Sequence, residues 1–251
     1  MSTTPAKTTL FTYKRLRDQE LAKATKPFNA KGKHVSRCKY CQLGAQACLC
    51  DYVPKIQSGV DFILLMHRNE LFKPTNTGRL LADINPHCHV HLWSRTQPEA
   101  ALLEMINDPD RQCFIVFPSS SIQADRPRPV YQHIPDTDKR TTFILLDGTW
   151  TQCSRMFSLG RWLDKIPVIE LPKGRTKGYQ VRKSLTDSQL ATAEAGMLCL
   201  ELAGESHNAG VLEHYFNVFN QHYLATRGSY LPEIGESHEQ LKQFINKDNM
   251  S

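Results

Sequence analysis

The feature that most constrains the fold is a series of short apolar runs that alternate with segments of helical pattern. The runs have the length and composition of buried strands and lie at residues 60–66, 90–93, 113–117, 142–147 and 168–171. The segments expected to be helical lie at residues 75–84, 98–107, 151–159, 188–203 and 211–225. Strands that alternate with helices predict an α/β fold, with a mainly parallel sheet covered by helices on both faces.

Hydropathy places the chain outside the membrane-spanning classes. The longest strongly apolar stretches, 62–66 and 113–117, are far below the roughly 20 residues of a spanning helix. Mean hydropathy is -0.43, and the N-terminal residues contain no apolar segment of the secretory type. The sequence therefore predicts a cytoplasmic protein with no membrane association, and nothing in it indicates an obligate protein partner.

Positive charge is concentrated at the N-terminus. The whole chain has a formal net charge of +6, yet residues 1–40 alone carry ten Lys or Arg and two acids, Asp18 and Glu20. The remaining residues carry 21 basic and 23 acidic side chains, so their net charge is -2. A basic arm over residues 1–35 is typical of a polyanion-binding element, and a solvated tail is an equally good interpretation of charge alone.

Four of the eight cysteines fall within thirteen residues, at Cys38, Cys41, Cys48 and Cys50. Four thiolates satisfy the tetrahedral preference of structural zinc, and zinc stabilises segments too small to bury a core of their own. Free thiols and an iron–sulfur cluster are the alternatives. We predict one structural Zn(II) in a small N-terminal module over residues 36–54. The other four cysteines stand singly in apolar patterns, as small buried side chains do.

A second motif reads Asp147-Gly148-Thr149-Trp150 and follows the run at 142–147. Ligands of parallel α/β sheets bind outside the carboxyl ends of the strands, so an acid at this place is a candidate functional residue. Thr149 could cap the next helix, and Trp150 offers a flat aromatic face. The plainer interpretation is a capping Asp with a core Trp.

Two further segments are polar where a ligand could bind. Residues 73–79, with Asn76, Thr77 and Arg79, precede a predicted helix and suit an anion or carboxylate, or form a plain cap. Residues 171–186 contain no acid and interleave an aromatic with basic side chains, a pattern that favours RNA contact over a solvated loop. The residues in question are Lys173, Arg175, Lys177, Tyr179, Arg182 and Lys183.

Five motifs together carry a family resemblance. They are the Cys-x2-Cys…Cys-x-Cys cluster, the 74–79 block, Asp147-Gly148-Thr149-Trp150, Tyr179-x-x-Arg182 and Thr192-Ala193-Glu194-Ala195. In this order they resemble the DTW-domain family over about residues 36–205, most closely its bacterial branch of tRNA-uridine aminocarboxypropyltransferases. The resemblance implies a SPOUT-like α/β fold with a C-terminal knot. Together with the patterns along the chain, it divides the sequence into the arm, the zinc module, a catalytic domain at 55–227 and a polar tail at 228–251, which its composition leads us to expect to be frayed.

The resemblance also implies an activity. Such enzymes transfer the 3-amino-3-carboxypropyl group of S-adenosylmethionine to N3 of a tRNA uridine, expected here to be position 47, and release methylthioadenosine. Uridine N3 must lose a proton before it attacks, so Asp147 is the predicted base within a catalytic set that includes Thr149 and Trp150. Trp150 is also expected to line the cofactor pocket. The other expected cofactor contacts are Asn76, Thr77, Arg79 and Arg182, and the expected RNA contacts are Lys173, Arg175, Lys177 and Tyr179.

Two other functions fit the same residues. A SPOUT-type RNA methyltransferase would share the fold and co-substrate but would release S-adenosylhomocysteine. A zinc-knuckle RNA-binding protein without catalytic activity would need the cysteines and the basic surfaces but would tolerate the loss of Asp147. The small-molecule product distinguishes the three functions.

Overall fold

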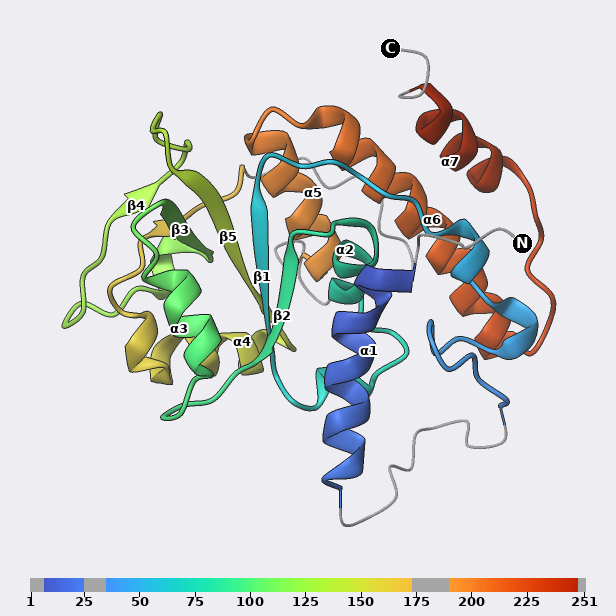
Figure 1. Cartoon of the computed structure of the whole chain (residues 1–251), viewed down its shortest axis with the longest axis horizontal. Helices are drawn as coiled ribbons and strands as arrows, with labels where there is room; N and C mark the ends of the chain where they lie inside the picture. The colour runs from blue at the N-terminus through green and yellow to red at the C-terminus, as the bar shows by residue number, and fades with distance from the viewer. Residues whose placement is uncertain (1–6, 25–34, 173–189, 248–251) are drawn as a thin grey trace.

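A computed structural model describes residues 7–24, 35–172 and 190–247. Its centre is a six-stranded sheet in the order β2-β1-β5-β3-β6-β4, and every paired strand runs parallel to its neighbour (Figure 1). The strands are β1 (Asp61–Met66), β2 (Cys88–Leu92), β3 (Arg111–Val116), β4 (Val130–Tyr131), β5 (Arg140–Asp147) and β6 (Val168–Ile169). The parallel sheet predicted from the sequence is therefore confirmed.

Helices cover both faces of the sheet, which confirms the α/β class. On one face lie α1 (Lys7–Ala22), α2 (Gly78–Ile84), α5 (Thr192–Leu202) and α6 (Ser206–Gly228), with α7 (Glu236–Lys247) packed outside α6. On the other face lie α3 (Ala100–Ile106) and α4 (Trp150–Leu159), seen on the left of Figure 1. Single 3-10 turns occur at Ala45–Ala47, Cys50–Tyr52, Glu70–Phe72, Ser119–Ser121 and Arg161–Leu163.

The strand β1 shows how the sheet divides the core. Successive side chains of a strand point to opposite faces, so an entirely apolar strand is buried on both. Phe62 and Leu64 belong to the cluster under α2, α5 and α6, whereas Ile63 and Leu65 belong to the cluster under α3 and α4. All six residues of β1 are buried, which explains why its sequence has no polar alternation.

The register of the two central strands brings their carboxyl ends together. Met66 of β1 pairs with Asp147 of β5, and the next residue, His67, donates its backbone N–H to the carbonyl oxygen of Asp147 at 2.8 Å. Both strands therefore end at the same level, and the loops that follow them start side by side.

Three predicted segments differ from the structure. The polar loop expected at 119–140 contains the short edge strand β4, whose two residues are too few to give an apolar run. The sequence predicts a helix from residue 188, whereas α5 begins at Thr192. The tail expected to be frayed contains α7, because Leu241 and His238 are buried against the rest of the protein. The prediction of a frayed tail is wrong over that helix.

The N-terminal segments share the main core. Leu43 and Leu49 of the cysteine segment are fully buried in the same cluster as β1 and α6. Tyr13 of α1 is also buried there, and its hydroxyl donates to the carbonyl of Leu71 at 2.8 Å. The division into four domains stays a prediction, and the described part of the arm is a packed helix.

Two further expectations concern a knot and the absence of membrane-spanning helices. The C-terminal knot that the family resemblance implies stays a prediction, because residues 173–189 of the C-terminal part lie outside the described residues. Within the described ranges, even the longest helix, α6, is too polar to cross a membrane, and the shorter helices do not qualify either.

Candidate functional site

Asp147 occupies the last position of β5, one of the central strands, and only 3% of its surface is exposed. Both of its carboxylate oxygens accept hydrogen bonds. Asn76 Nδ2 donates to Oδ2 at 2.5 Å, and the hydroxyl of Thr192 donates to Oδ1 at 2.5 Å. Asp147 therefore links the end of the sheet to the beginnings of α2 and α5.

The environment of Asp147 shifts its acidity. Burial raises the pKa of Asp147 to about 6, because a charge in a low-dielectric site loses its hydration. The hydrogen bonds from Thr192 and Asn76 stabilise the ionised form and limit the rise. Around neutral pH the group is mainly a carboxylate with an affinity for protons far above that of an exposed Asp.

The 76–79 segment is shaped around this carboxylate. Asn76 Oδ1 accepts the backbone N–H of Arg79 at 3.0 Å, which fixes the amide so that its Nδ2 faces Asp147. A Cβ on Gly78 would lie 2.9 Å from Leu64 Cδ1 and 3.1 Å from Asp147 Cγ, so a larger residue here would force one of these two side chains to shift. Thr77 Oγ1 accepts the N–H of Ala193 at 3.5 Å and adds a second link to α5.

The turn after Asp147 is built as a helix cap. Thr149 Oγ1 accepts the N–H of Gln152 at 3.3 Å, and Gln152 Oε1 accepts the N–H of Thr149 at 2.8 Å. This reciprocal pair is a capping box, so the predicted capping role of Thr149 is confirmed. The alternative that Asp147 caps this helix is wrong, since its carboxylate is bound elsewhere.

Trp150 stands at the first turn of α4 with 44% of its surface exposed. One face of its indole stacks on Phe117, with ring centroids 5.4 Å apart and an interplanar angle of 9°. Phe117 in turn stacks on Phe157 at 4.6 Å. The aromatic stack fixes the indole at the carboxyl edge of the sheet, where its outer face can meet a ligand. The idea of a fully buried core Trp is wrong.

Arg79 lies away from this cluster. Its side chain is 2% exposed, donates through Nη1 to the carbonyl of Cys41 and sits 5.3 Å from the ring centre of Phe219. The side chain thus joins α2 to the cysteine segment and α6. Its Nε and Nη2 have no hydrogen-bond partner among the described residues, and the expected contact of Arg79 with the cofactor stays a prediction.

The four clustered cysteines are arranged as a metal site. Their sulfur atoms all lie within 4.8 Å of one another, with 3.7 Å between Cys38 and Cys50 and 3.9 Å between Cys41 and Cys48. Zinc–sulfur bonds of about 2.3 Å in a tetrahedron place sulfurs about 3.8 Å apart, so the cluster fits a metal ion held by four thiolates. The backbone turns back through Gln42, which has a φ of 62°.

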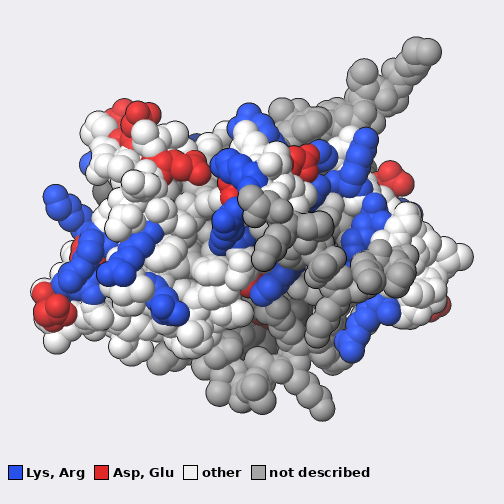
Figure 2. All heavy atoms as spheres, turned by 90° about the horizontal axis from the view of Figure 1, so that it is seen from below, with Lys and Arg blue, Asp and Glu red and all other residues white. Residues whose placement is uncertain are grey.

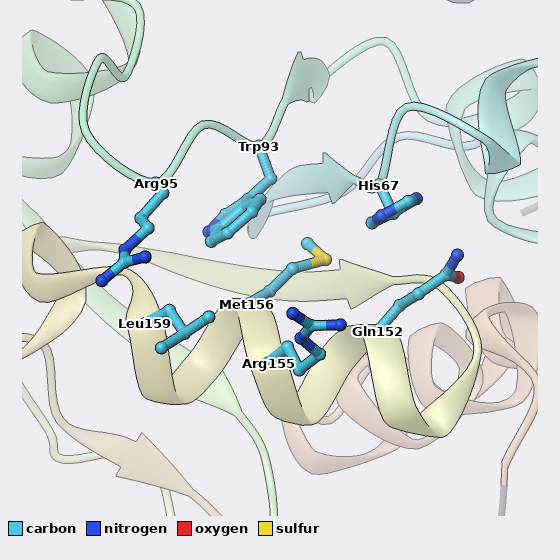
Figure 3. A pocket seen from close by; sticks show the side chains of 7 residues that line it. All are labelled: His67, Trp93, Arg95, Gln152, Arg155, Met156 and Leu159. Carbon is cyan, nitrogen blue, oxygen red and sulfur yellow. The ribbon is translucent and has the colours of Figure 1, made fainter.

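A hollow opens beside the capped turn, between the loops after β1 and β2 and the outer side of α4 (Figure 3). Its volume is about 330 Å³. The residues that line it are His67, Trp93, Arg95, Gln152, Arg155, Met156 and Leu159. Gln152 belongs both to this hollow and to the cap of Thr149, so the hollow adjoins the Asp147–Trp150 turn.

Comparison with known proteins agrees with this arrangement. The DTW domain family matches residues 35–224, which is most of the chain and contains both the cysteine cluster and Asp147. The chain belongs to the DTW domain family. No solved structure is significantly similar to it.

Two curated relatives of this DTW protein are called tRNA-uridine aminocarboxypropyltransferase 2. The Mus musculus protein is 24% identical over 173 residues, which are 66% of this chain and 55% of the mouse protein. The Drosophila melanogaster protein is 23% identical over 223 residues, which are 85% of this chain and 82% of the fly protein. The chain therefore spans about half the length of its mouse relative. Both relatives are animal proteins, so closeness to the bacterial branch stays a prediction.

Some residues predicted for the DTW site cannot be placed. Lys173, Arg175, Lys177, Tyr179 and Arg182 lie outside the described residues, and their contacts stay predictions. Sequence reasoning assigned no role to Thr192, although it belongs to a recognised motif. It also missed the hollow, whose only sequence signal is that His67 and Trp93 lie at the ends of predicted strands.

Proposed function

We propose that this DTW protein is a tRNA-modifying enzyme that transfers the 3-amino-3-carboxypropyl group of S-adenosylmethionine to N3 of a uridine. The observation that carries the proposal is the family match over residues 35–224, together with relatives named for this activity. The fold alone is compatible with several kinds of transferase. The expected uridine is position 47 of the tRNA variable loop, and the protein is expected to act in the cytoplasm.

The geometry around Asp147 supports a role as proton acceptor. Uridine N3 carries a proton that must leave before its lone pair attacks the methionine Cγ carbon of S-adenosylmethionine. The C–S bond then breaks, its electron pair stays on sulfur, and neutral methylthioadenosine leaves. A carboxylate with a pKa of about 6 suits the removal of the N3 proton near neutral pH, because it is ionised yet more basic than an ordinary Asp.

Access to Asp147 is a further part of the proposal. Its Oδ1 is bound by the hydroxyl of Thr192, which can both accept and donate a hydrogen bond. We infer that the N3 proton reaches the carboxylate through this hydroxyl, since Asp147 itself is almost fully covered. Thr192 would then pass one proton to Asp147 while receiving another, so it ends unchanged.

The cysteine cluster is proposed to bind one structural Zn(II). Four protein ligands close the coordination shell, so the ion would support the fold and leave no open position for a substrate. The carbonyl of Cys41 accepts the buried Arg79 guanidinium, and Leu43 and Leu49 fill the core beneath. These contacts connect the metal site to α2 and α6, whereas the carboxyl edge of the sheet lies apart from it.

A product assay tests the proposal. Purified protein is incubated with a tRNA transcript and S-adenosylmethionine, and both the small molecule and the digested nucleosides are measured by liquid chromatography with mass spectrometry. Methylthioadenosine and a modified uridine are the expected products. S-adenosylhomocysteine would identify a methyltransferase instead. Binding of tRNA without either product, with S-adenosylmethionine at saturation, would contradict an enzymatic function.

A further inference from the structure

The hollow beside α4 is lined by hydrogen-bond donors, and none of its seven lining residues carries a carboxylate. Arg95 and Arg155 lie on its rim, are exposed, and form no hydrogen bond or ion pair through their guanidinium groups within the described part of the chain. In Figure 3 they approach the hollow from opposite walls, Arg95 from the loop after β2 and Arg155 from α4. Two free guanidinium groups at one opening favour a negatively charged ligand.

The hydrogen-bonding states of the other polar residues also favour a ligand that accepts hydrogen bonds. His67 Nδ1 accepts the N–H of Asn69 at 3.3 Å, so a neutral ring carries its proton on Nε2. Burial lowers the pKa of His67 below its usual value; the charge of Glu70 opposes this shift, and the charges of Lys73 and Arg155 add to it. Gln152 uses Oε1 on the N–H of Thr149, which leaves its NH2 group as a donor. The hollow therefore offers donors to a ligand that is rich in acceptor oxygens.

An aromatic wall adds a surface for a planar group. Trp93 extends from the end of β2 into the hollow, above Met156 and Leu159 of α4 (Figure 3). Gly160 allows the indole to pack closely, since a Cβ there would lie 3.2 Å from Trp93 Nε1. Unpaired RNA bases bind proteins mainly by stacking on such rings, while their phosphates meet basic side chains.

We propose that this hollow binds one unstacked nucleotide of the RNA substrate, with its base against Trp93 and its phosphate between Arg95 and Arg155. The inference rests on the proposed function, because it assigns the hollow to the RNA and not to the co-substrate. S-adenosylmethionine carries a carboxylate but also a positive sulfonium and a positive ammonium group, so its net charge is +1, and two arginines favour the net negative phosphodiester of RNA over it. The volume of about 330 Å³ lies at the small end of ligand sites, as suits a single nucleotide.

The position of the hollow agrees with this assignment. It lies at the edge where the strands end, and it shares Gln152 with the turn that carries Asp147 and Trp150. Figure 2 looks at the molecule from this side and shows Lys and Arg side chains at several places across the face. An RNA strand that places its uridine near Asp147 would thus pass over a basic surface that includes the hollow.

The test is tRNA binding by the double variant Arg95→Gln/Arg155→Gln, followed by fluorescence anisotropy over a range of salt concentrations. We expect affinity to fall roughly tenfold near physiological salt and the slope of log K against log salt to decrease by about 1, for the one phosphate that both arginines contact. The matched control is Lys139→Gln/Lys165→Gln. These exposed lysines precede β5 and β6, at the opposite edge of the sheet, and should leave both quantities within about twofold.

The aromatic wall is tested separately with Trp93→Leu and Trp93→Phe. Both variants fill the space with an apolar side chain, but only Phe keeps a flat ring. We expect Leu to weaken tRNA binding roughly tenfold and Phe to retain most of the affinity. Thermal unfolding and S-adenosylmethionine binding, which should match the wild type, show whether each variant is folded.

The two proposals fail in different ways. Unchanged tRNA affinity and salt slope in the double arginine variant would overturn the nucleotide site, even if the protein makes methylthioadenosine. Wild-type protein that does not bind tRNA would overturn it as well. A protein that binds tRNA through the hollow but yields no methylthioadenosine would refute the proposed function and leave the site standing.

Discussion

The carboxyl group of Asp147 lies where burial and hydrogen bonding act in opposite directions. Burial alone would favour the protonated form, and the donors Asn76 and Thr192 favour the carboxylate. The resulting pKa of about 6 is lower than burial without partners would give. Any change to these two neighbours should therefore alter the acidity of Asp147 before it alters the fold.

The first prediction at this scale concerns Asp147→Asn. The amide can still accept from Asn76 and can donate to the hydroxyl of Thr192, so the links to α2 and α5 should persist. Single-turnover rates with saturating tRNA and co-substrate should fall by roughly 10²–10⁴-fold, since the proton acceptor is lost. S-adenosylmethionine binding should change little. A rate within a few-fold of the wild type would remove Asp147 from the chemistry.

The wild-type rate should also depend on pH. A base must be ionised to act, and the raised pKa of Asp147 means that protonation begins to inactivate it near pH 6. Below that value the single-turnover rate should fall about tenfold per pH unit. A rate that stays constant down to pH 5 in folded protein would contradict this assignment.

Thr192→Val gives a second prediction for the same pair. The hydroxyl of Thr192 lowers the pKa of Asp147, so its removal should raise that pKa and move the acidic limb of the rate profile to higher pH. It should also reduce the rate on the plateau if the hydroxyl relays the proton. Thr192→Ser keeps the hydroxyl and serves as the control. Identical profiles for Val and Ser would exclude a role for the hydroxyl.

How far single residues could be predicted from the sequence depends on whether their role is local. The cap formed by Thr149 follows from chain-adjacent residues, and it was predictable. Contacts such as Arg79 with Cys41 or Asp147 with Thr192 join positions far apart in the chain. No spacing rule fixes such pairs, which is why the sequence did not predict the contact of Arg79 with Cys41.

At the scale of elements, the cysteine segment owes its form to four sulfurs and two buried leucines. Leu43 and Leu49 belong to the core beneath the main sheet. The segment therefore packs against α6 as well as forming a small module of its own. Removal of the proposed zinc should therefore lower the stability of the protein beyond residues 36–54.

Cys41→Ser tests this coupling. The variant should lose the proposed zinc and unfold at a lower temperature, because it lacks one of the four clustered thiols and because the Cys41 carbonyl accepts from the buried Arg79. Affinity for tRNA should fall before affinity for S-adenosylmethionine does. Cys199→Ala is the control, since Cys199 is buried in α5 and should leave one zinc per chain. Elemental analysis that finds no zinc in the wild type, or iron with sulfide, would contradict the metal assignment.

The helix α7 is the element that the amino-acid composition does not predict. Its sequence is mostly polar, but Leu241, Phe244 and Ile245 recur at helical spacing and pack against the core with His238, a periodic signal that the polar composition outweighed in the prediction. His238 Nε2 lies 3.0 Å from Nε2 of His222 on α6, and the two rings meet the ring of Tyr52 edge-on. Tertiary contacts of this kind stabilise short polar helices that propensity alone would leave frayed.

Leu241→Ala is the corresponding prediction. Leu241 is 1% exposed, and deletion of such a buried side chain usually costs about 2–5 kcal/mol. Hydrogen exchange should accelerate throughout α7, whereas the amides of β1 and β5 should stay protected. Gln243→Ala, on the same helix but exposed, should have little effect. Equal exchange in the two variants would contradict the docking of α7.

For the whole molecule, the order of the strands decides which loops meet. The apolar runs predict five strands and their direction, but they do not say that β5 inserts between β1 and β3. That insertion places Asp147 beside the end of β1 and makes His67 its neighbour. Strand order depends on how the helical connections pack over the sheet, and hydrophobic pattern along the chain does not encode it directly.

The charge distribution leads to the last prediction, which concerns tRNA binding by the molecule as a whole. Positive charge concentrates at residues 1–40 and recurs at 173–183 within a chain that is otherwise slightly acidic. In the described part of the arm, Arg17 is buried and donates to the carbonyl of Lys39, so not all of that charge is free for RNA. We therefore expect the 173–183 segment to carry a large share of the phosphate contacts.

Charge reversal at Lys173, Arg175 and Lys177 should weaken tRNA binding and reduce its salt dependence by about 3 in log–log slope, one for each lost phosphate contact. S-adenosylmethionine binding, measured by calorimetry, should be retained. The control is charge reversal at Lys139, Lys165 and Lys242, three exposed cations on other parts of the surface; the ion pair of Lys242 with Glu239 is exposed and contributes little. Because both variants change the net charge equally, a long-range field effect would weaken them alike. Only loss of direct phosphate contacts would separate them, and equal weakening would therefore count against this segment as the RNA-binding surface.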